Sequence, residues 1–167
     1  QTISNHKRSL NASFRIAIAD DLVRKNPFDF KLNEVIEDDR TPRQALTEEQ
    51  EEKLLSFASK DKVYKKYYDA IVILLKTGLR ISELCGLTRQ DIDFENGVIH
   101  VDHQLLSSKE TGYYIETPKT KSGVRDIPMS EEVKQAFERV MANKPKAEPI
   151  EVDGYRGFLF LNGKGYP

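Results

Sequence analysis

The sequence predicts an α+β fold: a mainly helical domain with a three-stranded antiparallel sheet, preceded by the last helix of a separate helical domain. Three observations predict it. Apolar residues recur at helical spacing in residues 10–22 and 64–75. Short β-type segments flank Asn96-Gly97, a strong hairpin signal. An amphipathic segment follows Ser130, a residue type that suits the N-cap of a helix.

Composition argues against several classes of protein. The 167 residues carry 26 basic and 27 acidic side chains, so net charge alone does not indicate a nucleic-acid partner. The longest apolar run, Ala70 to Leu75, is far shorter than the about 20 residues of a membrane span, and residues 1–10 lack the apolar core of a signal peptide. One cysteine excludes an internal disulfide and, with three histidines, disfavours a zinc site. We expect a cytoplasmic protein without a metal, a cofactor or a membrane partner.

The first predicted helix precedes Asn26-Pro27, which should end it because a proline disfavours helical backbone in the residue before it. Its apolar face consists of Leu10, Phe14, Ala17, Ile18 and Leu22. A single helix cannot bury such a face alone, so we expect it to belong to a neighbouring domain or to pack on the next part of the chain. Residues 29–46 are polar and acidic and are predicted to be a connector.

Three helices should follow this connector. Thr47 and Gln50 have capping-box spacing before a helix over residues 48–59. Its inward residues should be Leu54, Leu55 and Ala58. The second helix has its apolar face at Tyr64, Tyr67, Tyr68, Ile71, Val72 and Leu75. Gly78 suits the left-handed residue that ends a helix, and a short helix over residues 82–87 comes directly after it.

Strands are predicted in the middle of the chain, at residues 92–94, 98–101, 113–115 and 124–128. Turns at residues 95–97, 109–112 and 121–123 would join them into a three-stranded antiparallel meander with a long middle section. A helix should follow Ser130, with Val133, Ala136, Phe137, Val140 and Met141 facing inward. Residues 144–149 should form a loop, and residues 157–161 a strand or a buried extended segment.

Two cationic residues are candidates for chemistry, each with a simpler alternative. Arg80 lies at a sharp join between two helices, where its guanidinium could hold a phosphate through two parallel hydrogen bonds and Glu83 could orient it. An isolated Arg-x-x-Glu is, however, more often an exposed surface pair. Lys121 lies near a predicted hairpin tip, where a lysine can deliver a proton. The alternative for Lys121 is a solvated turn residue.

The remaining reactive side chains favour structural roles. Cys85 follows a leucine on the short helix and is expected to be a small core residue. His100 and His103, three residues apart in a strand, should point to opposite faces and therefore not share a metal ion. Tyr64, Tyr67 and Tyr68 share the spacing of a packed helical face, so packing is their default role.

Several segments resemble motifs of the tyrosine recombinases, or phage-type integrases. Thr77 to Leu87, TGLRISELCGL, resembles the first arginine box of this family, and Asp91-Ile92-Asp93 matches its continuation. Thr120 to Pro128, TKSGVRDIP, resembles the family's β-hairpin lysine segment. Residues 26–28 and 157–160 look like the end of the core-binding domain and the strand before the later catalytic boxes. Together with residues 43–47, these motifs look most similar to those of integrases of conjugative transposons from Gram-positive bacteria.

The resemblance implies a reaction and roles for three residues. Such enzymes cut a DNA strand by attack of a tyrosine, form a 3′-phosphotyrosyl link and need no metal. Arg80 would hold the non-bridging phosphate oxygens, Lys121 would protonate the leaving 5′-oxygen, and Glu83 would support Arg80. The expected partners are double-stranded DNA and other protomers in a synaptic complex, with no small-molecule substrate, at the bacterial nucleoid.

A set of basic residues should contact DNA phosphates rather than bases, because they lie in the connector, at the start of the tyrosine-rich helix or beside the hairpin tip. These residues are Arg40, Arg43, Lys62, Lys65, Lys66, Lys119 and Arg125.

One departure from the family is large. The 167 residues contain no His-x-x-Arg, and none of the seven tyrosines matches the family's nucleophile. We therefore interpret the chain as a fragment: residues 1–30 as the end of a SAM-like core-binding domain, 31–46 as a linker and 47–167 as the first two-thirds of a catalytic domain. Two alternatives remain, a recombinase-like DNA-binding module that never cuts and a protein–protein scaffold. Steep salt dependence of DNA binding would exclude the scaffold.

Overall fold

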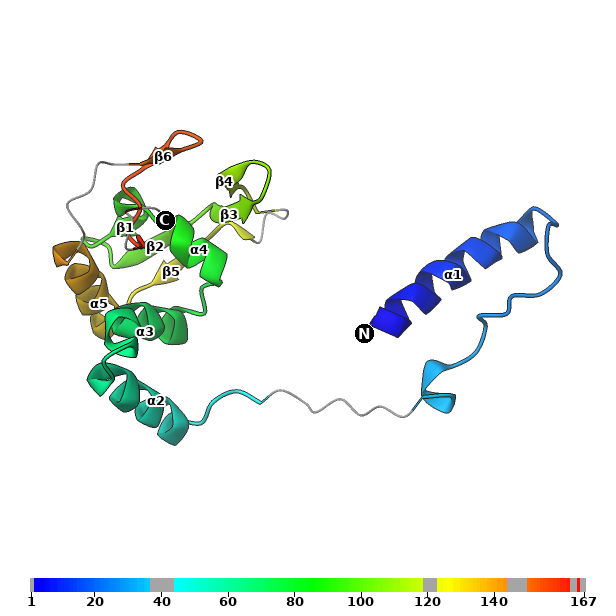
Figure 1. Ribbon diagram of the computed structural model, residues 1–167, viewed down its shortest axis with the longest axis horizontal. Helices are drawn as coiled ribbons and strands as arrows, with labels where there is room; N and C mark the ends of the chain where they lie inside the picture. The colour runs from blue at the N-terminus through cyan, green and yellow to red at the C-terminus, as the bar shows by residue number, and fades with distance from the viewer. Residues whose placement is uncertain (1, 37–43, 119–122, 144–149, 163–164, 166–167) are drawn as a thin grey trace. The chain divides into compact units, whose positions relative to one another are not determined.

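The structure is a computed structural model that describes residues 2–36, 44–118, 123–143, 150–162 and 165. The chain divides into two compact units, Gln1–Ala45 and Leu46–Pro167, which we describe separately (Figure 1). Three predictions fall outside the described residues, wholly or in part: the hairpin tip at 121–122, the loop at 144–149 and residues 37–43 of the connector. Among the described residues, no helix is both long enough and apolar enough to cross a membrane.

The first unit contains α1 (Thr2–Ala19) and the 3-10 turn η1 (Leu32–Glu34). The prediction that α1 continues to Asn26-Pro27 is wrong. Asp21 adopts a left-handed backbone, with φ 56°, and the Leu22 amide donates to the Ala17 carbonyl at 2.9 Å. This is a helix-ending arrangement in which aspartate takes the place that glycine usually fills, because aspartate tolerates positive φ better than most residues.

Asn26 fixes the segment that returns along α1. Its side-chain amide donates to Asn11 Oδ1 at 2.9 Å, and its Oδ1 accepts the Phe28 amide at 3.0 Å. The rings of Phe14 and Phe28 then lie 5.3 Å apart. No residue of α1 is buried, and Leu22 stays 75% exposed, so the predicted apolar face is only partly covered.

The second unit begins with α2 (Glu48–Lys60), whose capping box is confirmed. The Gln50 amide donates to Thr47 Oγ1 and the Thr47 amide donates to Gln50 Oε1, at 3.3 and 3.0 Å. Ala58 is buried and Leu55 packs on the core, but Leu54 is exposed, so its predicted inward position is wrong.

The tyrosine-rich segment differs from a single helix. It consists of the 3-10 turn η2 (Tyr64–Tyr67) and α3 (Tyr68–Thr77). Tyr64 and Tyr67 are about half exposed, at 50% and 49%, whereas Tyr68 packs on the core; the predicted packing of the first two is therefore wrong. A 3-10 turn has three residues per turn, so it rotates these two side chains out of line with the buried face of α3.

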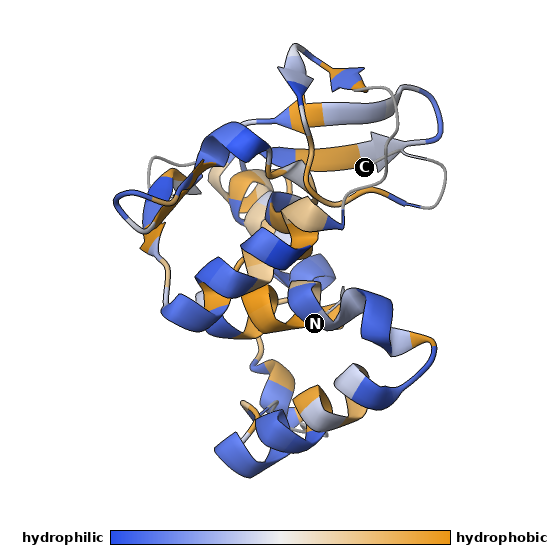
Figure 2. Cartoon of the chain, turned by 90° about the vertical axis from the view of Figure 1, so that its left-hand side faces the viewer, coloured by the Kyte–Doolittle hydropathy of each residue, from blue (hydrophilic) through white to orange (hydrophobic). Residues whose placement is uncertain are grey.

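Gly78 ends α3 as predicted, with φ 67°. The chain then forms α4 (Ile81–Gly86) and the 3-10 turn η3 (Arg89–Asp91). Later, Ser130 caps α5 (Glu131–Ala142) by accepting the Val133 amide, and α5 packs against α3. Figure 2 shows apolar and polar residues on the same helices, as amphipathic helices require.

The predicted three-stranded antiparallel sheet exists, but it is not a meander. Its strand order is β1 (Ile92–Asp93), β2 (Val98–Val101) and β5 (Arg125–Pro128). Between β2 and β5 the chain leaves the sheet and forms a separate hairpin of β3 (Gln104–Ser108) and β4 (Gly112–Glu116). Tyr113 to Ile115 therefore pair with β3. They do not join the three-stranded sheet, because the edge of β2 on that side is occupied by β5, with Val101 opposite Arg125.

A third small hairpin was not predicted: β6 (Glu151–Val152) and β7 (Tyr155–Arg156). Its turn is Asp153-Gly154, both with positive φ, a sequence signal for a tight hairpin. Phe158 and Leu159 then continue as the predicted buried extended segment, in which the Leu159 amide donates to the Leu87 carbonyl at 2.9 Å.

The core of the second unit lies between α3, α4, α5 and the three-stranded sheet. Its most buried members are Val72, Ile73, Leu84, Leu87, Ile99, Val101, Val133, Ala136 and Phe137. A smaller cluster under the β3–β4 hairpin contains Leu105, Val152 and Phe158. The short α4 lies beside both clusters, since Leu84 belongs to the first and Cys85 packs on the second.

Candidate active site

Arg80 is held at the join between α3 and α4 by the residues around it. Gly78 turns the chain out of α3, the buried Leu79 anchors it, and Arg80 takes the extended backbone of an N-cap, with φ −73° and ψ 152°. The Glu83 carboxylate accepts the Arg80 amide at 2.8 Å. That amide is thus already bonded within the protein, which fixes the backbone from which the Arg80 side chain extends.

Glu83 is the centre of the site, with its side chain only 4% exposed. Besides the Arg80 amide, it accepts Nη1 of the Arg80 guanidinium at 2.8 Å. It also accepts both terminal nitrogens of Arg125, at 3.0 and 2.8 Å. Two guanidinium groups and one amide therefore satisfy a single buried carboxylate.

These bonds shift the acid–base behaviour of the site. The Arg125 hydrogen bonds, together with smaller effects of the Arg80 amide and guanidinium, lower the pKa of Glu83 to about 2 against the opposing effect of burial. The same pair raises the pKa of Arg125. Glu83 is therefore ionised at neutral pH and keeps a fixed negative charge behind both arginines.

One terminal nitrogen of the Arg80 guanidinium is fixed by a hydrogen bond, while most of the side chain remains exposed. Glu83 binds one terminal nitrogen, yet the Arg80 side chain is 71% exposed. A guanidinium has five N–H donors in a rigid plane, so the donors that Glu83 does not use can still bind an oxyanion. The arrangement can present a preoriented cation to a phosphate.

Arg125 lies closer to this site than its sequence position suggests. The sequence predicts a phosphate contact beside the hairpin tip, whereas the structure places its guanidinium on Glu83, with its side chain 30% exposed and Nη1 also donating to the Gly123 carbonyl at 3.3 Å. Sequence reasoning missed this contact because Glu83 and Arg125 are 42 residues apart. Only the pairing of β2 with β5 brings them together.

The other predicted site residues fall into two groups. Arg40, Arg43, Lys119 and Lys121 lie outside the described residues. Lys62, Lys65 and Lys66 are exposed in and just before η2, and the Lys66 ammonium lies 4.7 Å from the centre of the Tyr67 ring. Exposed cations beside exposed tyrosines form a surface that suits a nucleic-acid backbone.

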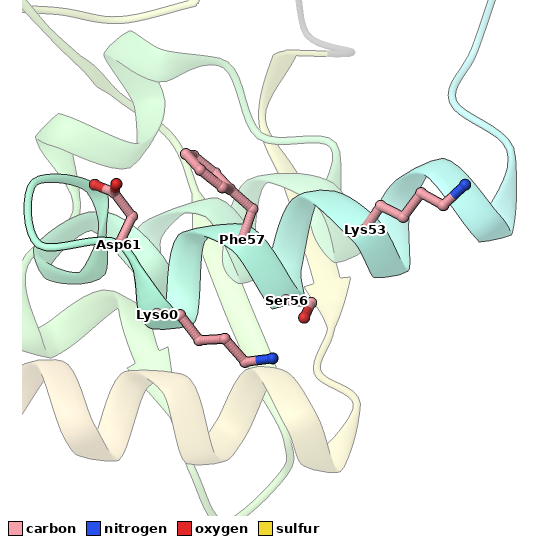
Figure 3. A pocket seen from close by; sticks show the side chains of 5 residues that line it. All are labelled: Lys53, Ser56, Phe57, Lys60 and Asp61. Carbon is pink, nitrogen blue, oxygen red and sulfur yellow. The ribbon is translucent and has the colours of Figure 1, made fainter.

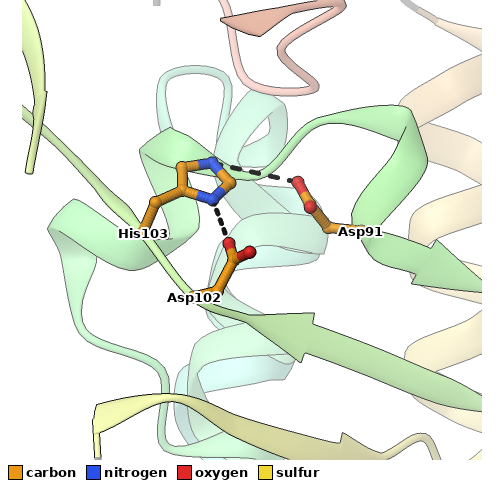
Figure 4. Close-up of side chains that lie close together, drawn as sticks. All are labelled: Asp91, Asp102 and His103. Atoms are coloured by element: carbon orange, nitrogen blue, oxygen red, sulfur yellow. Dashed lines mark hydrogen bonds and ion pairs between the residues drawn. The ribbon is translucent and has the colours of Figure 1, made fainter. Parts of the chain in front are cut away.

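A second polar cluster surrounds His103, which sequence reasoning did not single out as part of a site (Figure 4). His103 is buried and contacts Asp102 Oδ1 at 2.5 Å and the Gly86 carbonyl at 2.8 Å, with Asp91 Oδ2 at 3.9 Å. The Tyr155 ring lies 4.3 Å away, and burial raises the pKa of its hydroxyl.

Asp91, Asp102 and His103 form the one group with metal-ligand spacing among the residues that the structure describes. Their ligand atoms are already engaged, since Asp91 Oδ2 accepts the Thr88 amide and hydroxyl at 2.6 and 2.7 Å. The geometry therefore fits a hydrogen-bonded structural cluster better than an ion site. His100 faces a different partner, Asp126, at 2.7 Å on the exposed side of the sheet.

Two further features carry no chemistry of their own. A pocket of about 420 Å³ on α2 is lined by Lys53, Ser56, Phe57, Lys60 and Asp61 (Figure 3). Lys53 also pairs with Glu49. Cys85 is half-buried, and burial raises the pKa of its thiol. Cys85 packs on the smaller apolar cluster and so fits a packing role, as the sequence predicts.

Known proteins similar to this chain agree on one family. The model of the phage integrase family matches residues 44–167. The transposase of transposon Tn916 from Enterococcus faecalis is 65% identical over all 167 residues, which span 41% of that protein. The tyrosine recombinase XerA from Pyrococcus furiosus is 41% identical over 76 residues, 42% of this chain and 26% of that protein.

Solved structures agree with these relatives. The Tn1549 transposon integrase in complex with a circular intermediate DNA superposes with a TM-score of 0.90 and 63% identity, over 99% of this chain and 52% of that one. A complex of the same integrase with transposon right end DNA gives a TM-score of 0.89. The chain spans about two-fifths of the length of the curated relatives in this group. From the matching family model, the sequence identity and the shared fold, it follows that the chain belongs to the phage integrase family of tyrosine recombinases.

Proposed function

We propose that this chain is part of a site-specific recombinase that cuts and rejoins DNA strands during transposition of a mobile element. The observation that carries the proposal is the Arg80–Glu83–Arg125 cluster, in which a buried carboxylate orients an exposed guanidinium. The 65% identity to a transposon transposase and the likeness to an integrase in complex with transposon DNA support the same activity.

The chemistry assigns a step to each cationic residue. A tyrosine oxygen attacks a DNA phosphate, a bond from that oxygen to phosphorus forms, and the bond to the 5′-oxygen breaks. Arg80 binds the non-bridging oxygens as charge develops on them, while Glu83 and Arg125 keep its plane fixed. Lys121 gives its proton to the leaving 5′-oxygen. We assign the attacking tyrosine to none of the seven in this chain.

The partners and domains follow from the same assignment. Double-stranded DNA is the substrate, and further recombinase protomers form a synaptic complex around it at the nucleoid. Residues 1–30 end a core-binding domain, residues 31–46 link it to the catalytic domain, and residues 47–167 supply the first part of that catalytic domain. Lys62, Lys65 and Lys66 are exposed, as phosphate contacts require.

The second candidate is a recombinase-like DNA-binding module that never cuts but binds phosphates through exposed residues such as Lys62, Lys65 and Lys66. The two candidates differ in covalent chemistry. A recombinase that carries these residues together with the family's remaining catalytic segments should form a phosphotyrosyl adduct on a nicked suicide duplex, visible on a denaturing gel.

The 167-residue chain alone should form no adduct, and Arg80→Lys in the longer protein should slow adduct formation by about 10²–10³-fold, since a point ammonium cannot replace the bidentate fork. Lys53→Arg, on the pocket of α2, is the matched control and should react at the normal rate. An adduct from the 167-residue chain, or a normal rate for Arg80→Lys, would contradict the assignment.

A further inference from the structure

We propose that the β3–β4 hairpin holds α4 in place, an arrangement that we call the brace. Within it, Gln104, with Ser82 and Glu116, is a positioning residue for the Arg80–Glu83 pair. The catalytic part of this inference rests on the proposed function. α4 has six residues, and a helix so short does not persist without tertiary contacts. It nevertheless carries Glu83 and begins at Arg80. The orientation of both side chains therefore depends on the elements that pack against α4.

The first contact is a chain of hydrogen bonds at the beginning of α4. Ser82 Oγ donates to Gln104 Oε1 at 3.0 Å, and Gln104 Nε2 donates to Glu116 Oε2 at 2.9 Å. Gln104 and Glu116 are direct partners in the β3–β4 register. An ionised carboxylate only accepts, so Glu116 turns the amide nitrogen of Gln104 toward itself and leaves the amide oxygen facing Ser82.

The second contact is at the end of α4. The His103 ring binds the Gly86 carbonyl through Nε2, and Asp102 holds its other nitrogen. Gly86 allows close approach, because a Cβ there would lie 3.0 Å from the Leu105 amide nitrogen and 3.3 Å from the Gln104 Cα. The start of β3 thus contacts α4 at both of its ends.

The strand that follows this segment, β5, contacts α4 a third time, through Arg125 on Glu83. Gln104 is the member of this brace best suited to a test. It is half-buried, its contacts are side chain to side chain, and its loss removes no core packing. The bond that reaches α4, from Ser82 to Gln104, joins two neutral groups and contributes modestly, so we expect a moderate effect on rate and none on DNA affinity.

The experiment compares two glutamines with similar partners. Gln135 Nε2 donates to Glu131 Oε1 at 3.1 Å on α5, so Gln135→Ala removes the same kind of bond away from α4. In a recombinase that carries these residues with the family's remaining catalytic segments, Gln104→Ala should slow single-turnover cleavage about 3- to 10-fold at unchanged duplex Kd. Gln135→Ala should change neither quantity.

Three further measurements separate positioning from a general loss of structure. In an Arg80→Lys background, Gln104→Ala should cause no additional slowing, because the fork that it orients is already gone. Glu116→Gln should cleave normally, since an amide oxygen still accepts from Gln104, whereas Glu116→Leu should match Gln104→Ala. Hydrogen exchange of the amides in residues 81–86 should rise in Gln104→Ala and stay unchanged in Gln135→Ala.

Normal cleavage by Gln104→Ala, or an equal additional loss in the Arg80→Lys background, would overturn the positioning role. The exchange measurement does not require cleavage. If the unaltered recombinase forms no adduct, the proposed function fails, while faster exchange in Gln104→Ala still supports the brace. If exchange in residues 81–86 is unchanged, the brace itself is wrong.

Discussion

The Glu83 carboxylate lies in the protein interior between two guanidinium groups. These groups make its burial possible, and the carboxylate in turn fixes where they lie. A buried charge is unfavourable unless it is paired and hydrogen-bonded, and here Arg80 and Arg125 supply both. The local spacing Arg80–Glu83 is visible in the sequence as a three-residue step. The Arg125 partnership is not, because periodicity and capping signals report neighbours along the chain only.

The first prediction concerns the pH dependence of stability. The pKa of Glu83 lies at about 2 in the folded protein, against 4.5 for an unperturbed glutamate, so its ionised form favours folding. The contribution is complete above about pH 5 and is lost as pH falls toward 2, with a maximum of about 3 kcal/mol. Glu83→Gln should therefore lower the free energy of unfolding at pH 7 by about 2–3 kcal/mol.

Denaturant titrations of both proteins at pH 7, 5 and 3 test this, and the difference between them should shrink at pH 3. Glu49→Gln is the control, because the Glu49–Lys53 pair is about three-quarters exposed on both sides and should give little difference at any pH. A difference for Glu83→Gln that is constant with pH would contradict the assignment.

The second prediction concerns the proton donor. Lys121→Ala should slow cleavage of an ordinary duplex, because the 5′-oxygen leaves poorly without a proton. A substrate with sulfur in the 5′-bridging position should restore the rate, since a thiolate leaves unprotonated. The measurement is the ratio of cleavage rates on the two substrates, with Arg80→Lys as the comparison that sulfur should not rescue. Equal loss on both substrates would assign Lys121 another role.

At the scale of elements, the sequence predicts helices better than it predicts sheet connectivity. The capping box at Thr47, the left-handed Gly78 and the Ser130 cap are local signals, and all three elements occur where they predict. The predicted meander was wrong because strand pairing depends on non-local packing: β5 pairs with β2, and the hairpin of β3 and β4 is inserted between them in the sequence. The predicted end of α1 was wrong because a left-handed residue, Asp21, stops the helix before the apolar pattern ends. The predicted packing of Tyr64 and Tyr67 was wrong because a 3-10 turn interrupts the helical periodicity.

The third prediction concerns the contact between α4 and β3. Alanine normally favours a helix over glycine by about 1 kcal/mol. At Gly86 the added Cβ would press on the backbone of Leu105 and Gln104, so Gly86→Ala should lower the free energy of unfolding by about 1–2 kcal/mol instead. Denaturant titration decides the sign, and a gain in stability would show that β3 moves aside without cost.

For the whole molecule, the formal net charge of −1 hides an uneven distribution of charge. Exposed lysines gather in and just before η2, between half-exposed tyrosines, while acidic residues fill the first turn of α2. A bulk charge count could not show this. The family could be identified from short motifs, whereas the geometry of the site required the fold.

The fourth prediction tests the predicted phosphate contacts. Reversing Arg43 and Lys66 to glutamate should weaken binding to all duplex sequences alike and reduce the slope of log Kd against log salt by about 2, because two phosphate contacts are lost. Reversing Lys31 and Lys53 changes the net charge equally at two exposed residues that are not among the predicted phosphate contacts, and it should leave the slope unchanged. Equal effects of the two double variants would reject Arg43 and Lys66 as phosphate contacts.

The partnership of Glu83 with Arg125 also sets the order in which the site matures. Arg125 follows Glu83 by 42 residues and reaches it only after β5 has paired with β2, a long-range step that closes a large loop. A nascent chain that has exposed α4 but not yet β5 holds Arg80 without its full support. The support of Glu83 by Arg125 is therefore added only after the chain has been synthesised through β5, so the orientation of the Arg80 side chain depends on a segment made well after α4.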